Sequence, residues 1–204
     1  GGKLQGAGPG WYRGWMYAPQ QGMLSQTESA QADQSAQLTG VHLTYHEALE
    51  GDFATKKLAF INGVRIGVQP IETWKDVFDA KTMDEISTGE ATLDCDRLSF
   101  AVAPGYANGS RNIPGVPTPW EMEALSGVVF RTRTENGVLE ATAARAAYMS
   151  GKDLFTIQGA PNRDALIQQT RANGQPGPGV RAMEMTIKPK TFEVVDSKIR
   201  GFNL

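Results

Sequence analysis

Short runs in which every second residue is apolar, separated by turn residues, restrict the fold of this sequence more than any other feature. Val41, Leu43 and Tyr45 alternate with polar residues, and a similar run spans residues 58–68. Side chains of a strand point to alternate faces, so a period of two is typical of a strand with one buried face. Because the same alternation returns around residues 128–133 and 183–188, the pattern predicts an all-β chain.

Glycine and proline separate these runs. The chain of 204 residues contains 23 Gly and 11 Pro, which favours many short elements joined by turns. Asn62-Gly63 and Asn136-Gly137 each stand between apolar runs, and this dipeptide indicates a hairpin or a bulge. We therefore expect about 10–15 short antiparallel strands in two related lobes stacked edge to edge.

Two segments do not follow the period of two. Residues 139–149 are rich in alanine and their apolar positions also fit a helix, but we predict a strand because both neighbouring segments resemble hairpins. Residues 72–87 fit either a short amphipathic helix or a long loop.

The distribution of Gly, Pro and polar residues predicts the domain organisation. Residues 18–37 are rich in Gln, Ser and Ala and predict a long polar loop, and residues 104–119 are rich in Pro and Gly and predict a loop or linker. The linker divides the chain into a first β lobe at 1–103 and a second at 120–204.

A repeated plan supports the pairing of these strands. Residues 141–159 and 181–201 each contain an alternating strand, a turn with lysine, an apolar strand that begins with Phe, and a closing Gly. Residues 91–100 repeat the first half of this plan, and residues 54–66 repeat it more loosely. Hairpin units that recur at such a period indicate stacked β-structure, in which each unit covers the apolar face of its neighbour.

Several motifs recur within these repeats. They are Ala141-x-Ala143-x-x-Ala146-x-Tyr148, Lys152-Asp153-Leu154-Phe155-x-x-x-Gly159, Ala-x-x-Met-x-Ile and Thr-Phe-x-Val within 182–194, Leu58-x-Phe60-x-x-Gly63-Val64-x-Ile66, and Gly89-x-Ala91-x-Leu93-x-Cys95-Asp96-Arg97-Leu98. In these hairpin patterns the sequence resembles the OstA-like family, the LptA-type domains of lipopolysaccharide transport, over about residues 54–102 and 124–201.

The resemblance implies a β-jelly-roll or folded sheet of stacked antiparallel hairpins. It implies a non-catalytic carrier without cofactor, in the periplasm or cell envelope of a diderm bacterium and active in outer membrane biogenesis. The partners would be lipopolysaccharide or another acylated lipid, and other β-domains joined by edge stacking. The candidates for lining a lipid groove are the residues expected to point inward, for which plain core packing is the alternative role: Leu58, Phe60, Val64, Ile66, Leu98, Phe100, Val128, Phe130, Leu154, Phe155, Ile157, Met185, Ile187 and Phe192.

The residue types that carry catalysis form no convincing constellation. The two histidines, His42 and His46, fit solvent-facing strand positions better than a metal site, which needs a further ligand. Asp94 and Asp96 would raise the pKa of the single cysteine, Cys95, so we expect a buried strand cysteine between two outward carboxylates. An enzyme would need a cleft where these side chains converge.

Charge and aromatic content restrict the partners. With 20 basic and 22 acidic residues dispersed along the chain, no nucleic-acid surface is visible, and no apolar run is long enough for a transmembrane segment. Arg131 and Arg133, with Arg145 and Arg163 further along, fit a solvated face better than a phosphate site. The four tryptophans fit core or sheet-covering roles. The alternative function is a structural or carbohydrate-binding β-module of a larger envelope protein.

Overall fold

The computed structural model describes residues 2–17, 38–104, 106, 118–188 and 194–198. Within these ranges the chain forms 13 strands in one antiparallel sheet, and the only helical element is a single 3-10 turn, η1 (Ala80–Thr82). This confirms the all-β prediction. The predicted loop at 18–37 and most of the linker at 104–119 lie outside the described residues. The strands are β1 (Lys3–Ala7), β2 (Gly10–Tyr17), β3 (Leu38–Tyr45), β4 (Ala48–Asp52), β5 (Lys57–Pro70), β6 (Ala91–Val102), β7 (Trp120–Thr134), β8 (Gly137–Met149), β9 (Leu154–Gln158), β10 (Ala165–Arg171), β11 (Pro176–Ala182), β12 (Glu184–Ile187) and β13 (Val194–Lys198).

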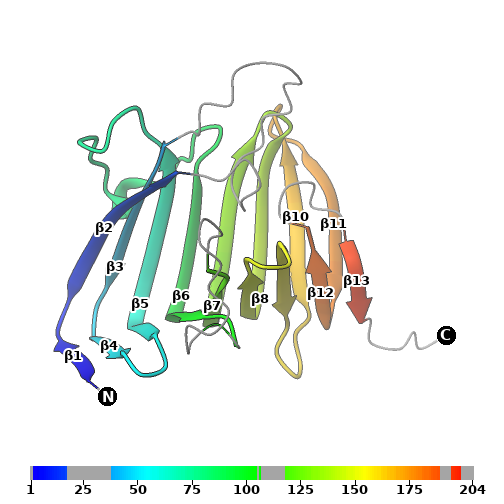
Figure 1. The fold of residues 1–204 in the computed structure, drawn as a ribbon. Helices are drawn as coiled ribbons and strands as arrows, with labels where there is room; N and C mark the ends of the chain where they lie inside the picture. The colour runs from blue at the N-terminus through cyan, green and yellow to red at the C-terminus, as the bar shows by residue number, and fades with distance from the viewer. Residues whose placement is uncertain (1, 18–37, 105, 107–117, 189–193, 199–204) are drawn as a thin grey trace.

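Long strands from β5 to β8 form the centre of the sheet, side by side (Figure 1). The two outermost long strands, β5 and β8, each pair with two shorter strands along their outer edge. Residues 57–61 of β5 pair with β4 and residues 65–70 pair with β3. In the same way, β8 pairs with β10 through residues 137–142 and with β9 through residues 145–149. The sheet therefore branches at both ends, and β6 and β7 join the parts of the chain before and after the linker.

A line of bulges crosses the middle of the long strands. The register shifts between Ile61 and Val64, between Asp94 and Arg97, and between Leu125 and Val128. In β5 and β7 the bulge contains two consecutive residues with positive φ, Asn62-Gly63 and Ser126-Gly127. A bulge bends its strand and adds local twist. Asn62-Gly63 is therefore a bulge within one strand, whereas Asn136 lies in the two-residue turn of the hairpin between β7 and β8, and Gly137 pairs with Thr134.

The bulges divide the sheet into two halves that face each other. Half-sheet A has the order β1-β4-β5-β6-β7-β8-β9-β12-β13, and half-sheet B has the order β2-β3-β5-β6-β7-β8-β10-β11. The rings of Phe130 in half B and Phe155 in half A lie 5.8 Å apart. In a flat sheet their rows would lie about 20 Å apart along the strands. The sheet is therefore folded over, and its two inner faces form one apolar core.

Alternation along the strands fills this core. The alanine-rich segment is a strand, as predicted, and not a helix, and its buried residues include Ala141, Ala143, Ala146 and Tyr148. Small side chains here leave room for larger ones from the facing half. The core cluster draws residues from both predicted lobes and from both half-sheets.

A loop covers part of the outer face of half B. Residues 71–90 form this loop around η1, so residues 72–87 take the loop alternative. A Cβ on Gly67 would come within 2.5 Å of the Met83 sulfur and 3.1 Å of the Ala80 Cβ, and a Cβ on Gly40 would come within 2.8 Å of Phe78. Glycines on neighbouring strands β3 and β5 therefore allow the loop to lie directly on the sheet, where Ala80 and Met83 are buried.

The depth of the core gives a direct stability test. Leu98 in β6 is 0% exposed, so Leu98→Ala leaves a cavity between the half-sheets and should lower the free energy of unfolding by about 2–5 kcal/mol. Val77→Ala, at a loop residue that is 66% exposed, is the control and should change it by less than about 0.5 kcal/mol. Denaturant titration of both variants measures this. If Leu98→Ala lowered the free energy of unfolding as little as Val77→Ala does, this result would contradict the folded core.

Candidate functional site

The structure places the predicted groove residues at three kinds of position. Nine are buried in the core cluster: Phe60, Val64, Leu98, Val128, Phe130, Phe155, Ile157, Met185 and Ile187. Leu58, Ile66 and Phe100 are partly buried against it. Leu154 lies on the face of β9 opposite to Phe155, as strand alternation requires, and Phe192 lies outside the described residues. The nine buried residues are therefore part of the hydrophobic core.

Aromatic side chains form a continuous line that begins at Tyr45, the last residue of β3, and continues across the inner face of half A. Successive ring centroids lie 5.5 Å apart from Tyr45 to Phe60, 6.4 Å from Phe60 to Phe100, 6.1 Å from Phe100 to Trp120, and 5.3 Å from Trp120 to Tyr148. Tilted and edge-to-face arrangements of this kind stabilise aromatic pairs. Trp120 is 37% exposed, so the line begins inside the core and reaches solvent at the rim of β7.

Cys95 is buried in the core, as predicted. Burial, followed by the charges of Asp94 and Asp96, raises the pKa of its thiol to about 12. A thiol with this pKa is protonated at neutral pH, and the thiolate is the nucleophilic form. Burial also raises the pKa of Asp94, although the guanidinium of Arg65, whose Nε lies 3.4 Å from Asp94 Oδ1, acts in the opposite direction. Cys95 is therefore a protonated, buried side chain of the core, and Asp94 and Asp96 are its neighbours on β6.

His42 corrects one sequence-based interpretation. We expected both histidines to face solvent, but His42 is 4% exposed, because the loop at 71–90 lies over β3, whereas His46 is exposed. The Ala80 N–H donates to His42 Nδ1 at 2.8 Å. Nδ1 therefore carries no proton, and the contact of 3.4 Å between Nδ1 and Asp79 Oδ1 is not an ion pair. In the described ranges no group of three or more His, Cys, Asp or Glu could hold a metal ion.

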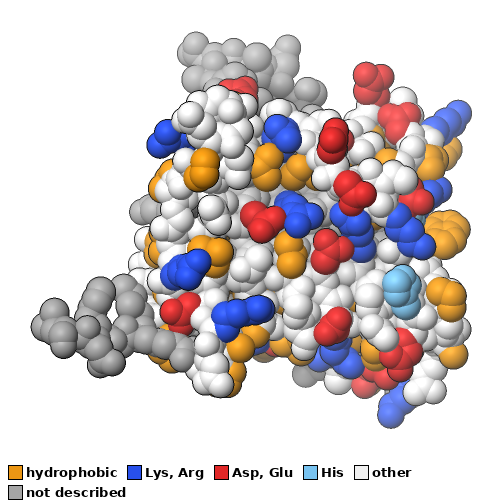
Figure 2. Space-filling model, turned by 180° about the vertical axis from the view of Figure 1, so that it is seen from behind, with side chains coloured by type: hydrophobic (Ala, Val, Ile, Leu, Met, Phe, Trp, Pro, Cys, Tyr) orange, Lys and Arg blue, Asp and Glu red, His pale blue; other side chains and the backbone are white. Residues whose placement is uncertain are grey.

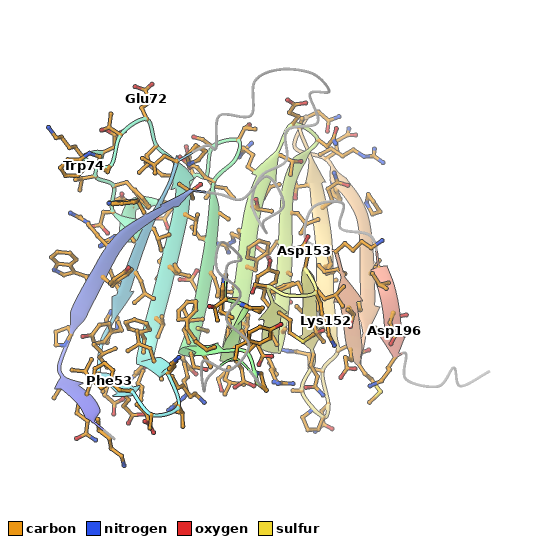
Figure 3. All side chains as sticks on the ribbon, viewed as in Figure 1. Phe53, Glu72, Trp74, Lys152, Asp153 and Asp196 are labelled. Carbon is orange, nitrogen blue, oxygen red and sulfur yellow. The ribbon has the colours of Figure 1, made fainter. Side chains whose placement is uncertain are left out.

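The tryptophans correct a second interpretation. We expected core or sheet-covering roles, yet Trp11 is 66% exposed, Trp15 54% and Trp74 64%. Trp74 lies on the covering loop at the periphery of the molecule (Figure 3). Trp11 and Trp15 lie on the outer face of β2, because their partners in β3 are Thr44 and Gly40 rather than the inward Leu43. Burial preference alone missed this, since it ignores that β2 is an edge strand.

The arginines of β7 and β8 lie in cross-strand ion pairs or donate to a backbone carbonyl. Arg131 Nε lies 2.7 Å from Glu140 Oε2, and Arg145 Nε lies 2.8 Å from Glu123 Oε1. Arg133 donates through Nε to the backbone carbonyl of Ile86. Figure 2 shows Lys and Arg interspersed with Asp and Glu on the face that it presents. These contacts agree with the solvated-face interpretation, because a carboxylate or carbonyl already occupies each of these guanidinium groups.

A hollow with a polar lining lies elsewhere, on the outer face of half B. It has a volume of about 320 Å³ between the start of β2, the end of β3 and the covering loop. Its lining includes His42 but not His46, Asp94 or Asp96, so the four side chains that an enzyme would need do not meet there. The sequence alone could not show that Trp11 and Arg13 of β2 lie beside Asp79 and Lys81 of the covering loop. The lining residues are Pro9, Gly10, Trp11, Arg13, His42, Thr44, Tyr45, Asp79 and Lys81.

The sequence matches no family model and no curated protein. The OstA-like resemblance therefore remains a hypothesis. In the part of the chain that the structure describes, no helix has the length and apolar character to cross a membrane.

Burial of His42 predicts a pH dependence of stability. Burial, and then the nearby charge of Arg13, lower the pKa of His42 below its ordinary value of 6.5, whereas Asp79 raises it and Lys81 lowers it. As the pH falls below the ordinary value, the unfolded chain takes up the proton first, so this contribution to stability is lost. The free energy of unfolding should fall more for the wild type than for His42→Asn between about pH 7.5 and about pH 5.5. The amide oxygen of Asn lies as many bonds from Cβ as Nδ1 does, so it keeps an acceptor for the Ala80 N–H, and Asn does not titrate. Parallel pH profiles would contradict the account.

Proposed function

We propose that this chain is a non-catalytic β-domain of the cell envelope that joins further β-domains edge to edge. The compartment comes from the OstA-like resemblance, and the mode of joining comes from the sheet. The single observation that carries the proposal is that half-sheet A has an open strand at each end. Within the described residues, β1 pairs only with β4, and β13 pairs only with β12. Figure 1 shows these two strands at opposite ends of the sheet.

Both end strands of half A have features of a docking edge. Neither contains proline, and both expose large apolar side chains: Leu4 in β1 is 39% exposed, and Val194 and Val195 in β13 are 38% and 50% exposed. An edge without proline presents free backbone donors and acceptors, and a further strand can pair with them. By contrast, β11 at one end of half B contains Pro176 and Pro178, which lack the N–H group that pairing needs. Half A is therefore the half in which both end strands suit extension, whereas of the two end strands of half B only β2 lacks proline.

The outward backbone groups of β1 follow from its pairing with β4. Gly8 donates its N–H to Glu47, and Phe53 donates its N–H to Gly2, so the even-numbered residues of β1 bond to β4. Antiparallel pairs alternate between bonded and non-bonded positions. The N–H groups of Lys3, Gln5 and Ala7 therefore point away from β4, toward any strand that is added.

This geometry defines an edge variant. Gln5→Pro removes one outward N–H and adds a ring to the edge, while the bonds of Leu4 and Gly6 to β4 remain. We expect the wild type to self-associate as concentration rises, with β1 of one copy pairing with β13 of the next, and Gln5→Pro to stay monomeric. Sedimentation velocity measures this.

Gln5→Ala keeps the N–H group and is the matched control, so it should associate like the wild type. Equal association of the wild type and Gln5→Pro would contradict pairing through β1. A wild type that is monomeric at every concentration would contradict edge joining between copies.

A second candidate function, binding of an acyl chain, is favoured by one observation. The aromatic line reaches solvent at Trp120, beside the partly buried Phe100 and Leu58. Apolar side chains that are accessible at one rim offer an entry for an acyl chain, whereas the buried residues behind them pack as a core.

Photo-crosslinking with a diazirine fatty acid tests this second candidate. We expect saturable labelling of the peptides that contain Phe100 and Trp120, detected by mass spectrometry. The peptide of Trp74, an exposed aromatic residue on the covering loop, is the internal control and should stay unlabelled. Absence of labelling at saturating probe, or equal labelling at Trp74, would contradict an acyl site at the rim.

A further inference from the structure

The cavity on the outer face of half B combines an aromatic surface with charged groups. The Arg13 guanidinium lies 5.2 Å from the centroid of the Trp11 ring, and the His42 ring lies 6.2 Å from it at a tilt of 55°. Trp11 is nevertheless 66% exposed, so much of the indole remains open to a ligand. An exposed aromatic ring beside polar groups suits the apolar face of a sugar, whose hydroxyl groups lie around its edge.

Two polar groups in the lining of the cavity, His42 and Asp79, are held in defined orientations. His42 accepts from the Ala80 N–H at Nδ1, so the proton of the neutral imidazole lies on Nε2, which acts as a donor. Asp79 Oδ1 accepts from the Lys81 N–H at 2.9 Å, which fixes the carboxylate. The cavity therefore offers donors from His42 and Arg13 and an acceptor from Asp79, a mixture that matches hydroxyl groups.

The charges in the lining are unequal. Arg13 and Lys81 are cationic, Asp79 is anionic, and His42 is neutral at pH 7, which leaves one positive charge in excess. An anionic substituent on the ligand would balance this charge. A volume of about 320 Å³ lies at the lower end of the range for small-molecule sites, which suits one sugar ring with a substituent rather than a long chain.

We infer that this cavity binds an acidic saccharide, with the sugar ring on Trp11 and its carboxylate or phosphate group between Arg13 and Lys81. The site lies on the outer face of half B, apart from the edges of half A and from the rim at Trp120. A negative result for this site would therefore not contradict edge joining or acyl-chain binding, and negative results for those two would not contradict this site.

Titration followed by ¹H–¹⁵N NMR tests the inference on the full chain. The probes are glucuronate and glucose 6-phosphate, which share a sugar ring but differ in the anionic group, together with neutral glucose and inorganic phosphate. We expect saturable shifts of the Trp11 indole N–H and the Ala80 amide with one or both acidic sugars. The acidic sugar that binds more tightly identifies the anionic group that the site prefers. Glucose and inorganic phosphate should each bind at least about fivefold more weakly.

Variants separate the site from other surface effects. Trp11→Ala and Arg13→Gln should each weaken binding by about fivefold or more, since each removes one contact. Trp15→Ala and Lys75→Gln are the matched controls: Trp15 is exposed on the same face of β2, Lys75 is exposed on the covering loop, and neither lines the cavity. The controls should bind like the wild type, with the dispersion of the spectra confirming that all variants fold.

Three results would overturn the inference. The first is the absence of saturable shifts with both acidic sugars, and the second is equal binding of inorganic phosphate, which would reduce the site to a simple anion site. The third is equal loss of binding in Trp15→Ala and Trp11→Ala, which would place the contact outside the cavity.

Discussion

The bend that folds one long sheet onto itself is the constraint from which the rest of the structure follows. Each long strand alternates apolar and polar residues, so a flat sheet would leave a whole apolar face in water. The bulges at Asn62-Gly63, Asp94 to Arg97 and Ser126-Gly127 bend the strands at the same level. The two halves of that face then bury each other, and Phe130 contacts Phe155 across the interior. No second sheet from another part of the chain is required to cover these apolar rows.

Folding in this manner leaves the ends of the sheet different from its centre. A barrel would pair its first and last strands, whereas here β1 and β13 each keep a free edge within the described residues. The cover of the outer face also differs from one part of the sheet to another. Ion pairs cover it over β7 and β8, and the loop at 71–90 covers it over β3 and β5. Between that loop and β2 the cover is incomplete, and the polar cavity lies there.

The sequence was sufficient for the local structure and for much of the core. Alternation identified most of the strands and inward residues, because a period of two fixes which side chains share a face, whereas the alanine-rich β8 was assigned from its hairpin-like neighbours. Alternation could not show that Asn62-Gly63 bends a strand instead of ending it, since both uses need positive φ. It also could not show that His42 is covered and Trp11 exposed. Those outcomes depend on where a distant loop lies and on which strand forms the edge.

The contact between the two half-sheets is the central claim, and nuclear Overhauser effects between aromatic rings test it most directly. Selective labelling of phenylalanine would resolve Phe130 in β7 and Phe155 in β9, whose ring centroids lie 5.8 Å apart. The account predicts a strong cross-peak between the two rings in the dilute, monomeric protein. A spectrum in which each ring contacts only its neighbours within one half-sheet would show that the sheet stays open and would contradict the folded core.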